Sequence, residues 1–92
     1  MHVRWDDPDD EEGNAFHITR EHGDRGITVE DVEHVIATGE RLGTETGYDF
    51  YVGRVPGHEL PLLVKAYGVD EIYPVRAHWI TDVRWRKYRD RP

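Results

Sequence analysis

The stretch ITVEDVEHVIATG, residues 27–39, determines how the rest of the chain can fold. Thr28 is a favourable N-cap because its hydroxyl can accept a hydrogen bond from the first helical turn, and Asp31 stands at the capping-box position. Gly39 is expected to end the helix in the left-handed conformation. The apolar residues between these ends recur at helical spacing and form one stripe: Val29, Val32, Val35 and Ile36. The stretch therefore predicts an amphipathic helix over 28–38 that must be covered by a sheet or another helix.

The segments on either side predict one α+β domain over residues 1–92. Asn14 is expected to cap a helix over 15–22 that stops at Gly23, and residues 23–26 read as a turn. Alternating or β-branched segments predict a short first strand and then a three-stranded antiparallel meander, over 2–5, 48–55, 60–67 and 71–79. Residues 40–47 read as a polar connection. Thr81 is expected to cap a final helix over 82–89, with Val83 and Trp85 available for packing.

Pro74 gives one further detail of the predicted sheet. Proline has no amide donor, so the strand over 71–79 should lie at an edge of the sheet or carry a bulge at this residue. We expect a two-layer arrangement in which the helices pack on one face of the sheet.

Composition limits the classes of protein that need to be considered. The 92 residues include no cysteine, and no apolar run approaches the ~20 residues of a membrane span. We therefore expect a soluble, cytoplasmic protein with no membrane contact. The net charge of −7 argues against avid nonspecific binding to nucleic acid, because affinity for phosphate comes largely from cations. The charge is unevenly distributed, however: residues 1–12 carry six acids, and residues 73–92 carry six arginines and lysines.

Arg76 and His78 form the most informative pair of polar residues. Two residues apart in a strand, they should point to the same face, with Tyr73, Val75, Ala77 and Trp79 on the other. A guanidinium can neutralise a phosphate oxyanion, and an imidazole can exchange a proton near neutral pH. The alternative interpretation is an ordinary solvent-facing side of an antiparallel sheet.

Other cations are predicted to lie near this pair. Arg84 and Tyr88 are four apart in the final helix and share one side of it, and Lys65 belongs to the neighbouring strand. Metal, serine-nucleophile and cysteine-nucleophile chemistry find no support, because the sequence has neither HExxH nor a cysteine, and serine is absent. The tryptophans and tyrosines could stack on bases, but in so small a domain we expect them mainly to fill the core.

Several segments, taken in order, resemble BrnT-type toxins of bacterial toxin–antitoxin pairs. These segments are WDD at 5–7, Asn14, HITREHG at 17–23, GITVEDVEHVI at 26–36 and IYPVRAHWITDVRWRKYR at 72–89. The resemblance implies a RelE-like fold, no cofactor, metal-independent cleavage of RNA to stop translation, and a partner antitoxin protein. Matching the closing motif places its arginine at His78, its threonine at Thr81 and its basic helix at Arg84, Arg86 and Lys87. The lysine that precedes the family's His-Gly pair is Glu21 here, and three residues are inserted after that pair.

The leading hypothesis is therefore a toxin-like endoribonuclease acting on RNA, including ribosome-associated mRNA. Arg76, His78, Arg84 and Tyr88 would be its catalytic residues. The substrate-binding residues would be Lys65, Arg86 and Lys87. A rival hypothesis is a non-catalytic protein-interaction domain on the same scaffold, and a third is a homodimer formed by pairing of edge strands.

Overall fold

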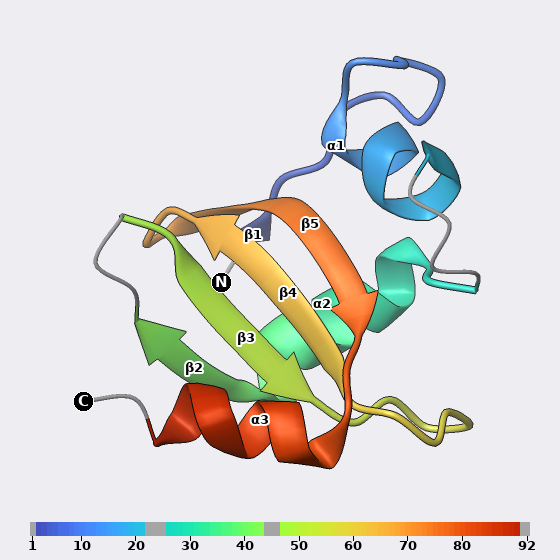
Figure 1. The fold of residues 1–92 in the computed structure, drawn as a ribbon. Coiled ribbons are helices and arrows are strands. Elements are labelled where there is room, and N and C mark those ends of the chain that lie inside the picture. Colours follow the sequence, from blue (N-terminus) through green and yellow to red (C-terminus); the bar gives the residue numbers. More distant parts are fainter. Residues whose placement is uncertain (1, 22–25, 44–46, 91–92) are drawn as a thin grey trace.

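The computed structural model describes residues 2–21, 26–43 and 47–90, and shows an α+β domain around a five-stranded mixed sheet (Figure 1). The strands lie in the order β1-β5-β4-β3-β2; β1 runs parallel to β5, and the other neighbours are antiparallel. The strands are β1 (His2–Val3), β2 (Glu40–Gly43), β3 (Asp49–Gly53), β4 (Leu62–Tyr67) and β5 (Glu71–Trp79). The helices are α1 (Asn14–Phe16), its π-helical continuation η1 (His17–Glu21), α2 (Val29–Thr38) and α3 (Asp82–Arg89).

Helix α2 has the predicted capping box at its N-terminus. The hydroxyl of Thr28 accepts from the Asp31 amide at 3.1 Å, and the Asp31 carboxylate accepts from the Thr28 amide at 3.1 Å. Gly39 ends the helix as its C-cap, as predicted, but the predicted left-handed conformation is wrong, because its backbone is extended, with φ −79° and ψ 175°. Glycine is required there for space: a Cβ would lie 2.5 Å from the Val35 carbonyl oxygen and 2.7 Å from that of Val52.

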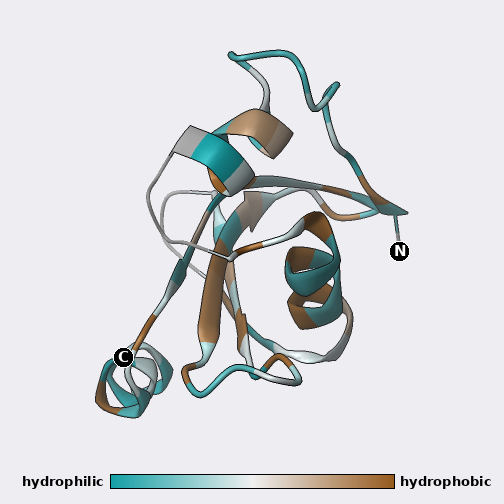
Figure 2. Cartoon of the chain, turned by 90° about the vertical axis from the view of Figure 1, so that its right-hand side faces the viewer, coloured by the Kyte–Doolittle hydropathy of each residue, from teal (hydrophilic) through white to brown (hydrophobic). Residues whose placement is uncertain are grey.

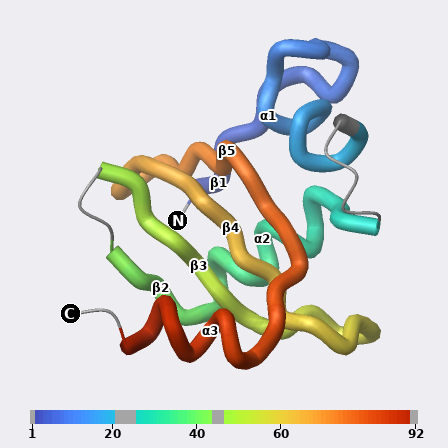
Figure 3. The backbone as a smooth tube through the Cα atoms, viewed as in Figure 1, coloured from blue at the N-terminus to red at the C-terminus, as the bar shows by residue number. Residues whose placement is uncertain are grey.

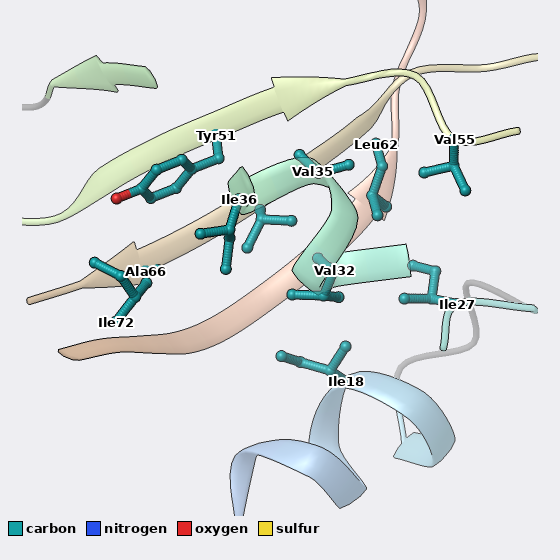
Figure 4. Close-up of a cluster of buried hydrophobic side chains, with 12 residues drawn as sticks. Ile18, Ile27, Val32, Val35, Ile36, Tyr51, Val55, Leu62, Ala66 and Ile72 are labelled. Atoms are coloured by element: carbon teal, nitrogen blue, oxygen red, sulfur yellow. The ribbon is translucent and has the colours of Figure 1, made fainter. Parts of the chain in front are cut away.

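The main core lies between α2 and the sheet (Figure 4). The apolar stripe of α2 supplies Val32, Val35 and Ile36, which are all buried. They pack against sheet residues that include Leu62, and Ile18 of η1 closes one end of the cluster. Burial of each such side chain is worth roughly 1.5–3 kcal/mol, so this stripe is the main reason that α2 stays on the sheet.

Helix α3 packs on the opposite face of the sheet. Its Trp85 and Tyr88 contact a second cluster that contains Val52 and Leu63, whereas the main cluster contains Tyr51, Leu62 and Val64. Neighbouring residues of a strand point to opposite faces, so the two clusters lie on opposite sides. Figure 2 shows α2 on one side of the sheet and the helix that carries the C-terminus on the other. The prediction that the helices pack on one face is therefore wrong.

A β-bulge divides β5 into two segments. Lys65 pairs with Arg76, but the next residue of β4, Ala66, pairs with Pro74, so Val75 is extra. This confirms the bulge alternative for Pro74; the strand itself is internal, between β1 and β4. Because the bulge changes the phase of alternation, Tyr73 faces the same way as Arg76. The prediction that Tyr73 lies on the packed face is wrong.

Several element boundaries differ from the prediction. Residues 40–43 form the edge strand β2 instead of a connection, although three of the four residues there are charged or glycine. The meander strands β3 and β4 are shorter than predicted, and β5 and α3 keep their predicted bounds. The predicted end of the first helix at His22 and Gly23, and most of the turn over 23–26, lie outside the described residues. No helix among the described residues has the length and apolar character needed to cross a membrane.

Asn14 does not cap the first helix, whose N-cap is Gly13. Its side chain is 4 % exposed and joins three segments of the chain. It donates to the carbonyl oxygens of Arg4 at 3.0 Å and Pro74 at 2.9 Å, and it accepts from the Asp6 amide at 2.9 Å. Asn14 therefore provides a hydrogen bond to the carbonyl of Pro74 beside the bulge.

Candidate functional site

The predicted polar pair lies on the face of the sheet that α3 contacts. In the register of β4 and β5, His78 lies opposite Leu63 and Arg76 lies opposite Lys65, so all four side chains share this face. Helix α3 crosses one end of the face, and no described helix covers the remaining parts of β4 and β5 (Figure 3). We call Lys65, Arg76 and His78, together with Arg84 and Tyr88 of α3, the basic face.

Polar contacts attach α3 to the sheet at several points. Thr81 is its N-cap, as predicted, and accepts from the Arg84 amide at 3.1 Å. The Glu40 carboxylate of β2 accepts from the Trp85 indole and from the Arg89 guanidinium, each at 3.2 Å. Arg54 also forms an ion pair with Asp82 in the first turn of α3. These contacts fix where the helix presents its remaining side chains.

Arg84 and Tyr88 lie side by side on α3, as their spacing predicts. The Arg84 guanidinium donates to the Tyr88 hydroxyl at 3.3 Å. The Tyr88 ring in turn packs on Phe50 of β3, with the ring centroids 5.1 Å apart. Phe50 is the register partner of Lys65, so Tyr88 is held next to the strand position of Lys65. Arg86 and Lys87 are exposed on the same helix, and neither side chain has a polar contact to another described residue.

The positive charges of the basic face are not neutralised within the described part of the chain. No described carboxylate forms an ion pair with Lys65, Arg76 or Arg84, and the Lys65 ammonium lies 4.4 Å from the centre of the Tyr48 ring. Two carboxylates at α3 are already paired: Glu40 with Arg89 and Asp82 with Arg54. The basic face is therefore locally positive on a chain of net charge −7.

A row of three tyrosines continues the basic face along β4 and β5. The Tyr67 ring lies 5.7 Å from that of Tyr48 and 5.3 Å from that of Tyr73, measured between centroids. The guanidinium of Arg4 lies 5.5 Å from the centre of the Tyr73 ring. Sequence reasoning missed this row, which we call the tyrosine row. The signal that could have found it is Pro74, because a bulge there brings Tyr73 onto the face of Arg76.

Tyr73 is fixed in place by the N-terminal segment. Its hydroxyl donates to the Asp6 carboxylate at 2.5 Å, and the same carboxylate oxygen accepts from the backbone N–H of Asn14 at 3.1 Å. These two hydrogen bonds, with that of Tyr73 the stronger, lower the pKa of Asp6. The same hydrogen bond to Asp6, helped by partial burial, raises the pKa of Tyr73 to about 12. The acidic segment is therefore attached to the sheet at the end of the tyrosine row.

The described residues offer no cluster of histidine and carboxylate side chains that could hold a metal ion. Comparison of the chain with protein-family models, curated proteins and solved structures finds no match. The likeness to BrnT-type toxins therefore rests on the quoted segments alone, and what it implies about fold and activity stays a prediction.

Proposed function

We propose that this protein is a toxin-like endoribonuclease with a RelE-like arrangement that cleaves RNA on its basic face without a metal ion. The observation that carries the proposal is the shared orientation of Arg76, His78 and Lys65, with α3 attached beside them so that Arg84 and Tyr88 border the same surface. A titratable imidazole among unpaired cations is the combination that metal-independent cleavage of a phosphodiester requires.

In the proposed reaction the RNA supplies its own nucleophile. The 2′-hydroxyl attacks the adjacent phosphorus, the bond to the 5′-oxygen breaks, and the products carry a 2′,3′-cyclic phosphate and a 5′-hydroxyl. His78 exchanges the proton, taking it from the 2′-hydroxyl or delivering it to the leaving oxygen. Arg76 and Arg84 stabilise the negative charge on the phosphate oxygens in the transition state. Tyr88, which is held by Arg84 and Phe50, supports a neighbouring base or the proton transfer.

The roles assigned to the remaining cations follow from their positions. Lys65 lies beside Arg76 and contributes to holding the phosphate chain. Arg86 and Lys87 are exposed on α3 and extend the positive surface from the sheet onto the helix. The expected setting is a bacterial cytoplasm, where an antitoxin partner would neutralise the protein by covering the basic face.

The test uses purified protein and an unstructured RNA in buffer that contains EDTA. Wild type should release fragments that end in 2′,3′-cyclic phosphate, and His78→Ala and Arg76→Ala should each reduce the rate by at least about 100-fold. Arg20→Ala is the matched control, because it removes an exposed arginine of η1, outside the basic face, and should leave the rate unchanged. Intact RNA after incubation with soluble, folded wild type would refute the proposal.

Expression in bacteria provides the second half of the test. Growth arrest by wild type that both His78→Ala and Arg76→Ala relieve would show that the basic face is responsible for toxicity. Normal growth with intact cellular RNA would instead support the rival function.

That rival is a non-catalytic interaction domain, and the acidic N-terminal segment favours it. Asp7, Asp9, Asp10, Glu11 and Glu12 are exposed on a loop that begins at the anchored Asp6. A fixed set of carboxylates repels RNA and attracts a basic protein surface. This alternative predicts that the protein binds a basic protein partner, and that Arg76→Ala does not weaken this binding.

A further inference from the structure

The tyrosine row and the basic face form one continuous surface. Tyr67 follows Lys65 by two residues in β4, and Tyr73 pairs with Tyr67 as Arg76 pairs with Lys65, so the rings and cations point the same way. Tyr48 connects the two sets, since its ring contacts both Tyr67 and the Lys65 ammonium. The surface therefore offers π-faces at one end and cations with an imidazole at the other.

Tyr67 is the member of the row best placed to receive a ligand. It is 44 % exposed, whereas Tyr48 and Tyr73 are partly buried on either side of it. Tyr73 is held by Asp6, and Arg4 lies over its ring, so Tyr67 packs on that side against a ring with contacts of its own. An exposed ring between two other rings, each of which also contacts a cation, resembles the platforms on which unpaired bases stack.

We propose that the tyrosine row is a stacking subsite for the bases of an unpaired RNA strand whose scissile phosphate lies at His78. This inference rests on the proposed nuclease function and adds the form of the substrate. Stacking needs bases that are not enclosed in a duplex, so the strand must be single where it crosses Tyr67. Lys65 and Arg76 lie between the two ends and attract the connecting phosphates.

The spacing between the subsite and His78 sets a minimum length for the substrate. His78 pairs with Leu63, which is four residues from Tyr67 in β4, so the separation is about 13 Å along the strand. A stacked strand advances about 3.4 Å per nucleotide, and the gap therefore corresponds to about four nucleotides. A dinucleotide can occupy the scissile position alone, whereas an octanucleotide can reach both ends.

Comparison of the octanucleotide with the dinucleotide distinguishes loss of base stacking from a general structural effect of the substitution. Tyr67→Ala should raise KM for an unstructured RNA octanucleotide by between about fivefold and about 150-fold, because one stacked base is worth ~1–3 kcal/mol. The same variant should cleave a dinucleotide at the wild-type rate. Tyr67→Phe keeps the ring and should behave as wild type with both substrates. Val69→Ala is the control for truncation of another exposed side chain in the same hairpin, and should also behave as wild type.

A second measurement keeps the two proposals distinguishable. The second measurement is binding of a labelled oligodeoxyuridine octamer, which lacks the 2′-hydroxyl and cannot be cleaved. Tyr67→Ala should bind this octamer more weakly than wild type does. Wild type should bind a duplex form of the octamer more weakly than the single strand. RNA cleavage by wild type with no change in octamer binding or KM in Tyr67→Ala would overturn the stacking subsite and leave the nuclease proposal standing. Octamer binding that depends on Tyr67, without cleavage of RNA, would overturn the nuclease proposal and the scissile position at His78, and would leave Tyr67 as a base-binding residue. Wild-type protein that neither binds nor cleaves would overturn both.

Discussion

Tyr73 and Arg76 face the same side of β5 although they are three positions apart, because the bulge at Val75 shifts the alternation of the strand. Without that extra residue, Tyr73 would point into the core beneath α2, and the tyrosine row would lose the ring at its anchored end. The bulge therefore joins the two halves of the surface. The hydrogen bond from Asn14 to the Pro74 carbonyl supports the bulged segment directly.

We therefore expect Asn14→Ala to destabilise the fold by about 2–3 kcal/mol, because it leaves the buried carbonyl of Pro74 without its donor. For a domain of this size, each kcal/mol lowers Tm by roughly 4–8 °C. Thermal unfolding followed by circular dichroism measures the effect. Asn14→Asp keeps the shape but has no amide donor, so it should be nearly as damaging. A Tm within 2–3 °C of wild type for both variants would contradict the role assigned to Asn14.

Gly39 and Gly43 form a matched pair at the two ends of β2. Gly39→Ala should cost about 2 kcal/mol, because its Cβ would lie 2.5 Å from the Val35 carbonyl oxygen and 2.7 Å from that of Val52. Gly43→Ala should be neutral or slightly stabilising, since the nearest atom is a side-chain oxygen at 3.9 Å. Chemical denaturation gives both values. Equal effects at the two positions would show that α2 and β3 do not approach as closely as described.

The hydrogen bond between Tyr73 and Asp6 should make stability depend on pH at both extremes. The pKa of Asp6 is below its ordinary value of 3.8, so this contribution is present above that pH and is lost as the pH falls through the lowered value. The pKa of Tyr73 is raised from 10.0 to about 12, so the contribution is present below pH 10 and is lost as the pH rises from there to about 12.

Comparison of wild type with Tyr73→Phe isolates this hydrogen bond from the other titrating groups. The variant should be less stable than wild type near neutral pH, and the difference should shrink at acid pH and again above pH 10. Denaturant midpoints collected across this pH range provide the measurement. A difference that stays constant at all pH values would mean that the two side chains are not coupled.

Thr81 should control the order of α3, because this helix has no fully buried residue and its partly buried Trp85 and Tyr88 leave much of its stability to its cap and its polar contacts. Thr81→Ala should reduce helix stability by about 1 kcal/mol, whereas Thr81→Ser keeps the accepting hydroxyl and should have little effect. Amide hydrogen exchange of residues 84–89 is the appropriate measurement, because fraying of an exposed helix can leave global unfolding unchanged. Identical exchange rates in the two variants would argue against the cap.

Elements with local signals were predictable from the sequence. Thr28 with Asp31, and Thr81, mark the helix starts that the structure confirms. Of the predicted apolar stripe, Val32, Val35 and Ile36 are buried as expected, whereas Val29 is only half-buried. The alternation of Arg76 and His78 also predicts their common face. These features depend on residues a few positions apart, so their physical cause is contained in short stretches of the chain.

Features that depend on distant contacts were not predictable in the same way. The four residues of β2 have little β-propensity, and they form a strand because β3 offers free hydrogen-bonding groups beside them. Val83 was expected to pack but is 56 % exposed, whereas Trp85 and Tyr88 face the sheet. Which side α3 takes is decided by Val52 and Leu63, since their burial requires a cover on the face away from α2.

The pairing of β1 with β5 has a consequence for how the protein folds as it is made. His2 pairs with Glu71 and Val3 with Ile72, so β1 finds its neighbour only after the residues between these two strands have left the ribosome. Helix α2 and the antiparallel hairpins can form earlier from nearby residues. We expect the amino-terminal strand to dock last, so that closure of this sheet edge also brings Asp6 to Tyr73 and completes the surface.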